Sequence, residues 1–443
     1  MDGTRKFTLF VAAGVVAVSV LTWVRRPQPG PIESFLPLDG DRAIVFRRND
    51  VQLVDRGVVR WEREGPAGAT VDADGIVVVR SRRRDVPVLE AYDARDGRTL
   101  WQLLPMGEAR DPRRAAFELM NLSLLATDNR VIAFHGHELR SPEADFVRVS
   151  GIDARTGVER WHTDLSGAQG AYGPAWLRGT SLVVFTWNAL SLIDATSGTS
   201  RAQVAADPDP CVTATHAWFT SGGQLHALSL ADGAIRTLPR PIDAPLQLHG
   251  LCAMHDGWLW VAASDRYGQK ADAFAPMWML ALDPATGALQ AQIDLGSVRV
   301  GSPDDQRAAE SVPDTLPLSG EATRFVPLVV EESRAAPRML MLDLDTRRVA
   351  WETEPSERFK HLRLLRAGSS NVAFERDAHL LASFAGASGE LTGAATVPRA
   401  PEIHGEHVWV TDGETLTRLD PKTLAPAKDA RADAETLFAQ GSR

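Results

Sequence analysis

The two cysteines are the side chains of this 443-residue chain that most directly suggest chemistry. Cys211 and Cys252 are 41 residues apart, about the length of one of the repeats described below. In an oxidising compartment they can form a disulfide, provided that the fold brings their Cα atoms within about 7 Å. Two small buried thiols are an equally good interpretation. No metal site is expected, because no cysteines or histidines have the spacing of metal ligands.

Acidic and histidine side chains are the remaining candidates for catalysis. The acidic pairs Asp304-Asp305 and Glu331-Glu332 are better explained as solvated charges on loops and strand ends than as an acid–base pair. The histidines are scattered along the chain, for example at His135, His137, His216, His226 and His255. We therefore predict no catalytic residues. The net charge of −9 also argues against a nucleic-acid partner, which would require a basic face.

A short phrase recurs along the chain and indicates how it is organised. The phrase is an aspartate, a glycine four residues later and a tryptophan four residues after the glycine. Its fullest copies are Asp93 with Gly97 and Trp101, Asp153 with Gly157 and Trp161, and Asp343 with Arg347 and Trp351. Partial copies are Asp194 with Gly198, Ser229 with Gly233, Asp283 with Gly287, and Ala385 with Gly389.

Each position of the phrase has a physical role. An alternating apolar run such as residues 86–92 precedes it and predicts a half-buried strand. The aspartate can accept hydrogen bonds from the backbone N–H groups two and three residues ahead, and the glycine can take the positive φ of a tight turn. The tryptophan then falls on the returning strand, where it can pack against a neighbouring sheet. The phrase therefore predicts strand, turn, strand and a side chain that docks one repeat on the next.

The number of repeats predicts a closed ring of small sheets. Nine short apolar runs mark nine units, at residues 43–46, 75–79, 131–134, 182–185, 217–219, 258–262, 325–330, 372–374 and 408–410. The terminal units are the weakest: the first has a shortened turn at residues 55–57, and the last, residues 420–428, lacks both glycine and tryptophan. Propellers usually have four to eight blades. We therefore expect the terminal units to share a blade, which gives an all-β, eight-bladed β-propeller of four-stranded antiparallel blades, with seven or nine blades as alternatives.

The repeated phrase resembles that of the pyrroloquinoline-quinone-type (PQQ-like) β-propellers over most of the chain, from about Ala43 to Asp420. This superfamily includes quinoprotein alcohol dehydrogenases, BamB-like outer-membrane assembly lipoproteins and non-catalytic envelope proteins. In the dehydrogenases, adjacent cysteines lie against the quinone, and Glu, Asn and Asp side chains bind calcium beside a catalytic Asp. This chain has no adjacent cysteines, so we expect the non-catalytic branch and no PQQ or other cofactor. It also lacks the N-terminal cysteine that carries the lipid in BamB-like members.

The N-terminus predicts a membrane anchor. Residues 7–23 are uncharged and mostly apolar, and basic residues flank them on both sides. This pattern favours a transmembrane signal-anchor at residues 1–26 over a cleaved signal peptide. A linker at 27–34, the propeller at 35–428 and a polar C-terminal tail at 429–443 follow. Together with the resemblance, the pattern predicts a single-pass protein of the bacterial inner membrane, with its propeller in the periplasm or outside the cell.

Interruptions of the repeat suggest where function lies. Insertions fall at residues 106–117, 135–145, 265–276 and 301–321, in connections that leave the blades on the face opposite the Asp/Gly turns. We read 106–117 and 301–321 as links between one blade's last strand and the next blade's first. Loops on a rigid scaffold commonly carry binding, although tolerated surface variation explains insertions equally well. We therefore expect a membrane-anchored interaction scaffold that binds an envelope protein or peptide. The alternatives are a quinone-dependent oxidoreductase or a degenerate relative, and a sugar- or polymer-binding propeller with Trp176 and Trp187 stacked on sugar rings.

Overall fold

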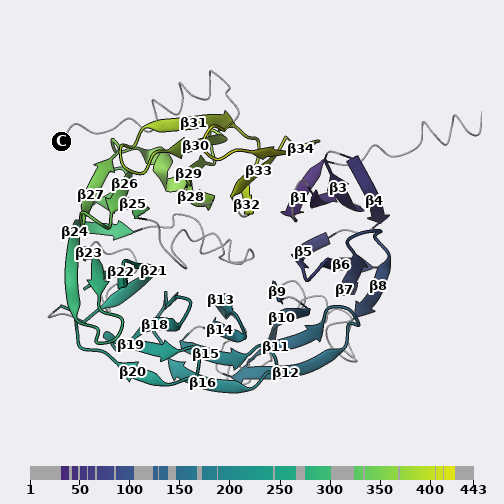
Figure 1. Cartoon of the computed structure of the whole chain (residues 1–443), viewed down its shortest axis with the longest axis horizontal. Coiled ribbons are helices and arrows are strands. Elements are labelled where there is room, and N and C mark those ends of the chain that lie inside the picture. Colours follow the sequence, from purple (N-terminus) through teal and green to yellow (C-terminus); the bar gives the residue numbers. More distant parts are fainter. Residues whose placement is uncertain are drawn as a thin grey trace, which may run out of the picture.

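The computed structural model describes residues 31–424, apart from internal gaps of which the longest are 104–122, 138–145, 266–274 and 301–323 and the others span at most five residues. Its strands form small antiparallel sheets that follow one another around a ring (Figure 1). Within each blade consecutive strands pair, from the centre of the ring outwards. The predicted all-β propeller of antiparallel blades is therefore confirmed.

The first four blades each contain four strands. Blade one consists of β1 (Ile32–Pro37), β2 (Arg42–Arg47), β3 (Asp50–Asp55) and β4 (Val58–Glu64). Blade two consists of β5 (Ala67–Asp72), β6 (Ile76–Arg83), β7 (Val86–Asp93) and β8 (Thr99–Leu103). Blade three consists of β9 (Ser123–Thr127), β10 (Arg130–His137), β11 (Phe146–Asp153) and β12 (Glu159–Ser166). Blade four consists of β13 (Tyr172–Arg178), β14 (Ser181–Thr186), β15 (Ala189–Asp194) and β16 (Ser200–Ala205).

Five further blades complete the ring. Blade five consists of β17 (Cys211–Val212), β18 (His216–Ser221), β19 (Gln224–Ser229) and β20 (Ile235–Thr237). Blade six consists of β21 (Gln247–His255), β22 (Trp258–Ser264), β23 (Ala275–Leu282) and β24 (Leu289–Val300). Blade seven adds β25 (Phe325–Glu332), β26 (Arg338–Asp343) and β27 (Arg348–Glu352), followed by the 3-10 helix η2 (Glu357–His361). Blade eight consists of β28 (Leu362–Ala367), β29 (Ser370–Glu375), β30 (Leu380–Phe384) and β31 (Leu391–Thr396). Blade nine has β32 (Glu402–His404), β33 (His407–Thr411) and β34 (Leu416–Leu419).

The ring has nine blades, so the expected count of eight is wrong. The terminal units do not share a blade: β1 to β4 form one complete sheet, and β32 to β34 form another. The shortened turn of the first unit still returns the chain, because Arg56 takes a positive φ of 50°. Each of the nine apolar runs overlaps the second strand of one blade. The expectation failed because it gave the usual size of propellers more weight than the repeat count itself.

Blades six and seven form one seven-stranded sheet, because β24 continues beyond blade six. Leu289 to Val298 pair with β23, and Val298 to Val300 pair with Glu332 to Val330 of β25. A register shift at Gly296, which has a φ of +81°, comes just before the residues that pair with β25. The end of β24 thus takes the place of a first strand in blade seven. The flanking strands therefore put the 301–321 insertion between the first and second strands of blade seven, which corrects our expectation that it links two blades.

The hydrophobic core is divided among the junctions between blades. Eight clusters of buried hydrophobic side chains are found among the described residues, and each is shared by two neighbouring blades. Alternate residues of a strand face opposite sides, so a single strand serves two clusters. In β2, for example, Ile44 and Phe46 face blade two. A blade too small to bury its own faces is stabilised by its neighbours.

The predicted location as a single-pass protein of the inner membrane is contradicted, because no helix in the described part of the chain could span a bilayer. The prediction depended on an apolar run at the short limit for a membrane-spanning helix and on the basic residues that flank it. The predicted anchor at residues 1–26 and the tail at 429–443 lie outside the described residues, as does half of the 27–34 linker, and β1 begins at Ile32.

Candidate functional site

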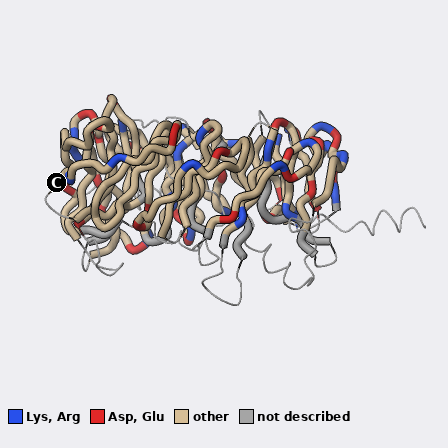
Figure 2. Tube along the Cα trace, turned by 90° about the horizontal axis from the view of Figure 1, so that it is seen from below, with Lys and Arg blue, Asp and Glu red and all other residues tan. Residues whose placement is uncertain are grey.

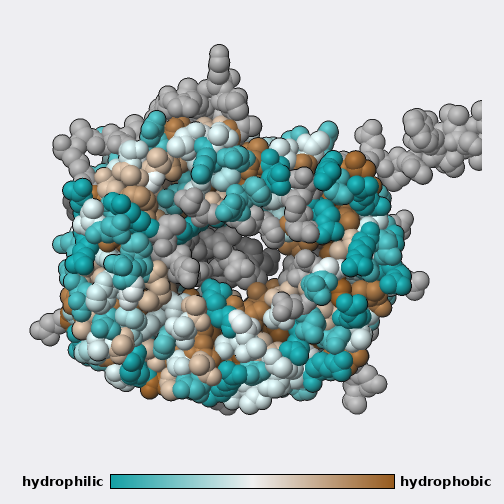
Figure 3. Space-filling view, viewed as in Figure 1, coloured by the Kyte–Doolittle hydropathy of each residue, from teal (hydrophilic) through white to brown (hydrophobic). Residues whose placement is uncertain are grey.

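The turns that join third and fourth strands lie at one face of the ring, which we call the turn face. Opposite it is the hairpin face, where second and third strands are joined. The edge-on view in Figure 2 shows basic and acidic residues interspersed, without a surface of one sign. The space-filling view in Figure 3 shows a face that is hollowed at its centre and that mixes hydrophilic and hydrophobic residues. The side of the ring seen in Figure 2 has no extended basic area of the kind that nucleic-acid binding uses.

Aspartates build the turns of the turn face. Asp194 accepts hydrogen bonds at Oδ1 from the backbone N–H groups of Thr196 and Ser197, at 2.8 and 2.9 Å. Asp283 accepts two in the same way, and Asp93 accepts one from Arg95. The turn glycines have φ values from +67° to +75°, at Gly97, Gly157, Gly198, Gly233, Gly287 and Gly389. Arg347, which replaces glycine in its copy, takes a φ of 58°.

Ion pairs strongly lower the pKa of two further turn aspartates, Asp153 and Asp343. Arg160 Nη2 lies 3.0 Å from Asp153 Oδ2, and this contact is the main reason that the pKa of Asp153 falls to about 2, helped by hydrogen bonds from Thr156. Arg324 donates to both carboxylate oxygens of Asp343, at 2.7 and 2.6 Å, and likewise lowers the pKa of Asp343 to about 2. Both carboxylates are therefore ionised structural acceptors at neutral pH and are unsuited to acid–base catalysis.

Tryptophans dock several blades onto the next turn. Trp101 lies over Gly157, where an added Cβ would come within 2.6 Å of the ring, and its Nε1 donates to Ala154 O at 2.7 Å. Trp61 makes the same pair of contacts with Gly97 and Ala94. A glycine at these positions is required both by the positive φ and by the indole that covers it. The residues of the phrase thus meet across blades, tryptophan of one on glycine of the next.

Two tryptophans vary this arrangement. Trp161 covers Gly198 in the same manner, but its buried Nε1 has no hydrogen-bond partner within the described part of the chain. Trp351 donates from Nε1 to Gly386 O at 2.9 Å, which docks blade seven on blade eight. Trp161 thus keeps the packing on a turn glycine without the hydrogen bond, whereas Trp351 keeps the hydrogen bond and is buried in the cluster between blades seven and eight.

Arginines dock the blades that lack the tryptophan. At the corresponding position blade four has Ala202 and blade five has Thr237. The preceding residue of each is an arginine. Arg201 pairs with Asp194 of its own turn and donates to Leu230 O and Ala231 O of blade five, each at 3.4 Å. Arg236 donates to Ala285 O and, at 2.7 Å, to Pro284 O of blade six.

The sequence analysis missed this second mode of docking. Its only sequence signal is an arginine seven residues after the first residue of the phrase where the tryptophan is absent, as at Arg201 and Arg236. Arg160 occupies the same position in a blade that keeps its tryptophan, and it pairs with its own Asp153 instead.

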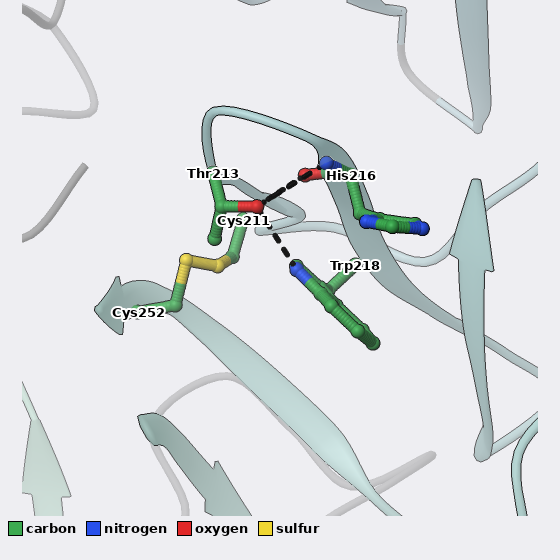
Figure 4. The surroundings of a disulfide bond; sticks show 5 residues. All are labelled: Cys211, Thr213, His216, Trp218 and Cys252. Atoms are coloured by element: carbon green, nitrogen blue, oxygen red, sulfur yellow. Dashed lines mark hydrogen bonds between the residues drawn. A yellow bond between two sulfur atoms is a disulfide. The ribbon is translucent and has the colours of Figure 1, made fainter. Parts of the chain in front are cut away.

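The structure brings the two cysteines together. Cys211 in β17 and Cys252 in β21 form a disulfide with their Cα atoms 5.8 Å apart, between the first strands of blades five and six (Figure 4). Both residues are almost fully buried. Beside the bond, Thr213 Oγ1 donates to His216 O at 3.0 Å and accepts from Trp218 Nε1 at 3.4 Å (Figure 4). This environment offers no exposed thiol chemistry, so the bond acts as a covalent link between two blades.

The junction of blades six and seven is polar at the turn face. His255 Nε2 lies 2.7 Å from Asp345 Oδ1, and Asp345 is also 3.2 Å from Arg324 Nε. Blade six has Ala291 where other blades have tryptophan. The histidine therefore fastens the next turn at a junction that lacks both the tryptophan and an arginine. No repeat pattern revealed this pair, because the partners are 90 residues apart.

The remaining candidates for chemistry do not converge. His226 interacts with Thr237 Oγ1 and stacks on Phe219, and burial lowers its pKa, as it does for His216. Within the described part of the chain no three His, Cys, Asp or Glu residues could hold a metal ion together. Trp176 is buried in the core between blades four and five. Asp304, Asp305 and Trp187 lie outside the described residues, as do nearly all of the four insertions.

Comparison with known proteins assigns the family. A family model described as outer membrane protein assembly factor BamB matches residues 15–237, half of the chain. The chain belongs to the BamB-like family of PQQ-like β-propellers. No curated protein matches this BamB-like propeller.

Several solved structures are similar to this chain over most of its length. BamB from Moraxella catarrhalis is 15% identical with a TM-score of 0.44, and the match covers 80% of this chain and 94% of that one. The dihydro-heme d1 dehydrogenase NirN is also 15% identical with a TM-score of 0.45, over 83% and 77% of the two chains. A quinohemoprotein alcohol dehydrogenase from Comamonas testosteroni is 13% identical with a TM-score of 0.44, over 88% and 71%.

Proposed function

We propose that this BamB-like propeller is a protein-interaction scaffold in envelope protein assembly, which binds an envelope protein or peptide, catalyses no reaction and uses no PQQ. The observation that carries the proposal is the family match over residues 15–237, because that family is described as an assembly factor. The docked turns support it, since they hold neighbouring blades in fixed positions and present a preformed surface. The ion-paired Asp153 and Asp343 of the turn face, whose pKa values are about 2, add no acid–base group.

The hairpin face is the better candidate for binding the partner. On the turn face, many turn residues are already engaged in contacts between blades, as Ala285 O is with Arg236. The hairpin that joins β29 to β30 is exposed from residue 376 to residue 379. Because exposed loops on a rigid scaffold commonly carry binding, we place the partner on the hairpin face.

Two exposed alanines provide a matched test of this placement. Ala378 lies on the hairpin face and Ala285 on the turn face, and both side chains are exposed. Tagged full-length protein would be crosslinked in cells of its native host, and the captured proteins identified. We expect capture of envelope assembly proteins, a clear loss with Ala378→Arg and no change with Ala285→Arg. Loss only with Ala285→Arg would move the site to the turn face.

An enzymatic role is tested separately. The purified full-length protein would be incubated with PQQ and calcium at micromolar concentration, then assayed by absorbance and by dye reduction with alcohols or sugars. We expect no bound quinone and no turnover. An absorbing holoprotein that reduces the dye would contradict the proposal in favour of the oxidoreductase alternative.

A further inference from the structure

The junction that closes the ring, between blades nine and one, differs from the other eight. Every other pair of neighbouring blades shares one cluster of buried hydrophobic side chains, such as the cluster of Trp101 and Leu124 between blades two and three. Among the described residues, no such cluster joins blades nine and one. The two blades do meet, since β1 is in contact with β32.

Apolar and polar side chains are mixed at this closing junction. Ile44 and Phe46 face blade two, so the alternating residues Ala43 and Val45 face blade nine. Ile32 and the partly buried Phe35 of β1 pair with Arg47 and Val45 and lie on the same side. On the other side, Val408 and Val410 pack towards blade eight, which leaves Trp409 and Thr411 facing blade one. In the described part of the chain these apolar side chains do not form one shared cluster like those of the other junctions.

A polar network completes the closing junction. Arg47 Nη2 donates to Glu414 O of blade nine at 3.0 Å, and Arg47 Nε donates to Gln52 Oε1 at 3.3 Å. Gln52 in turn donates to Glu62 at 3.2 Å. Nearby, burial, and then repulsion from Glu62, raise the pKa of Asp50, while Arg47 opposes the rise. Hydrogen bonds of partly exposed side chains add little net stability compared with buried apolar area.

We propose that the ring opens locally at this junction: blade nine separates from blade one while the other eight junctions stay closed. Local opening follows the least stable contacts of a structure. The disulfide blocks the same motion between blades five and six, and the shared seven-stranded sheet blocks it between blades six and seven. Opening exposes Val45 and Trp409 to solvent. The proposal is independent of the proposed function.

Single cysteines test the opening directly, because both native cysteines are held in the disulfide. Val45→Cys places a thiol in the closing junction. Val184→Cys is the matched control, since both valines are fully buried on second strands, and Val184 lies in the cluster between blades three and four. We expect a thiol reagent to label folded Val45→Cys at least about tenfold faster, a difference of about 1.4 kcal/mol in opening. Equal or slower labelling of Val45→Cys would overturn the proposal.

A second measurement avoids any change in the core. Arg47→Ala removes the arginine that crosses the closing junction, and Arg236→Ala removes one that crosses from blade five to blade six. Amide hydrogen exchange would follow β2 and β33 in the first variant and β18 and β22 in the second. We expect Arg47→Ala to speed exchange at its junction several-fold and Arg236→Ala to leave its junction unchanged. An equal response at both junctions would contradict local opening between blades nine and one.

Discussion

Blades one and two are joined to their successors by tryptophan, whereas blades four and five are joined to theirs by arginine. Trp101 buries its ring on Gly157 and uses its Nε1 for a single hydrogen bond. Arg236 instead reaches two carbonyl oxygens of blade six through a largely exposed side chain. The arginine-docked junction between blades five and six also carries the disulfide. Similar turns are thus docked by two kinds of side chain, and the covalent link lies at a junction that lacks the tryptophan.

The largest expected effect separates the two modes of docking. Trp101→Ala leaves a cavity over Gly157 and an unpaired carbonyl at Ala154, so we expect a loss of about 3 to 5 kcal/mol in the free energy of unfolding. Arg236→Ala should cost about 1 kcal/mol or less. Chemical denaturation measures both, with the exposed Val158→Ala as control. Equal losses in the two variants would mean that packing on the turn glycine is not what distinguishes the junctions.

The disulfide has the next largest expected effect. Replacing Cys211 and Cys252 together by alanine should lower the free energy of unfolding by about 2 to 4 kcal/mol, because the bond closes a chain segment of 41 residues. Thermal unfolding of the wild type in excess reductant is the matched control and should approach the variant. A variant as stable as the oxidised wild type would show that the arginines suffice at this junction.

Ion pairs in the turns should contribute less. The pKa of Asp343 is lowered to about 2 in the folded protein, below its usual unfolded value, so its stabilisation is present above about pH 4 and is lost as the pH falls through about 2. We expect Asp343→Asn to cost about 1 to 2 kcal/mol at pH 7 and progressively less below pH 4. Asp345→Asn, at a more exposed carboxylate, should cost under about 1 kcal/mol. A cost of Asp343→Asn that does not change with pH would exclude the ion pair as its source.

The smallest effect compares two tryptophans. Trp101→Phe removes a hydrogen bond to Ala154 O, whereas Trp161→Phe removes an N–H group that is buried without a partner. We therefore expect Trp101→Phe to be the more destabilising by about 1 kcal/mol in urea denaturation. If Trp161→Phe is as costly, the Trp161 N–H group has an acceptor, such as a buried water.

The sequence predicted the features that are local and repeated. Asp153, Gly157 and Trp161 lie within nine residues, so the turn and the strand that returns from it could be read from one phrase. The number of blades could not be predicted from the phrase, because it depends on whether the first and last units form separate sheets. The His255–Asp345 pair depends on how neighbouring blades are placed, and no sequence pattern around either residue predicts it. The shared strand β24 likewise arises from one register shift at Gly296.

The measurement that tests the account most directly is amide hydrogen exchange of the full chain, followed by mass spectrometry. The junctions between neighbouring blades differ in stability around the ring. We therefore predict that second strands are protected in all nine blades, most strongly in β18 and β22 beside the disulfide and least in β2 and β33. Protection of β2 and β33 that equals or exceeds that of β18 and β22 would contradict this account.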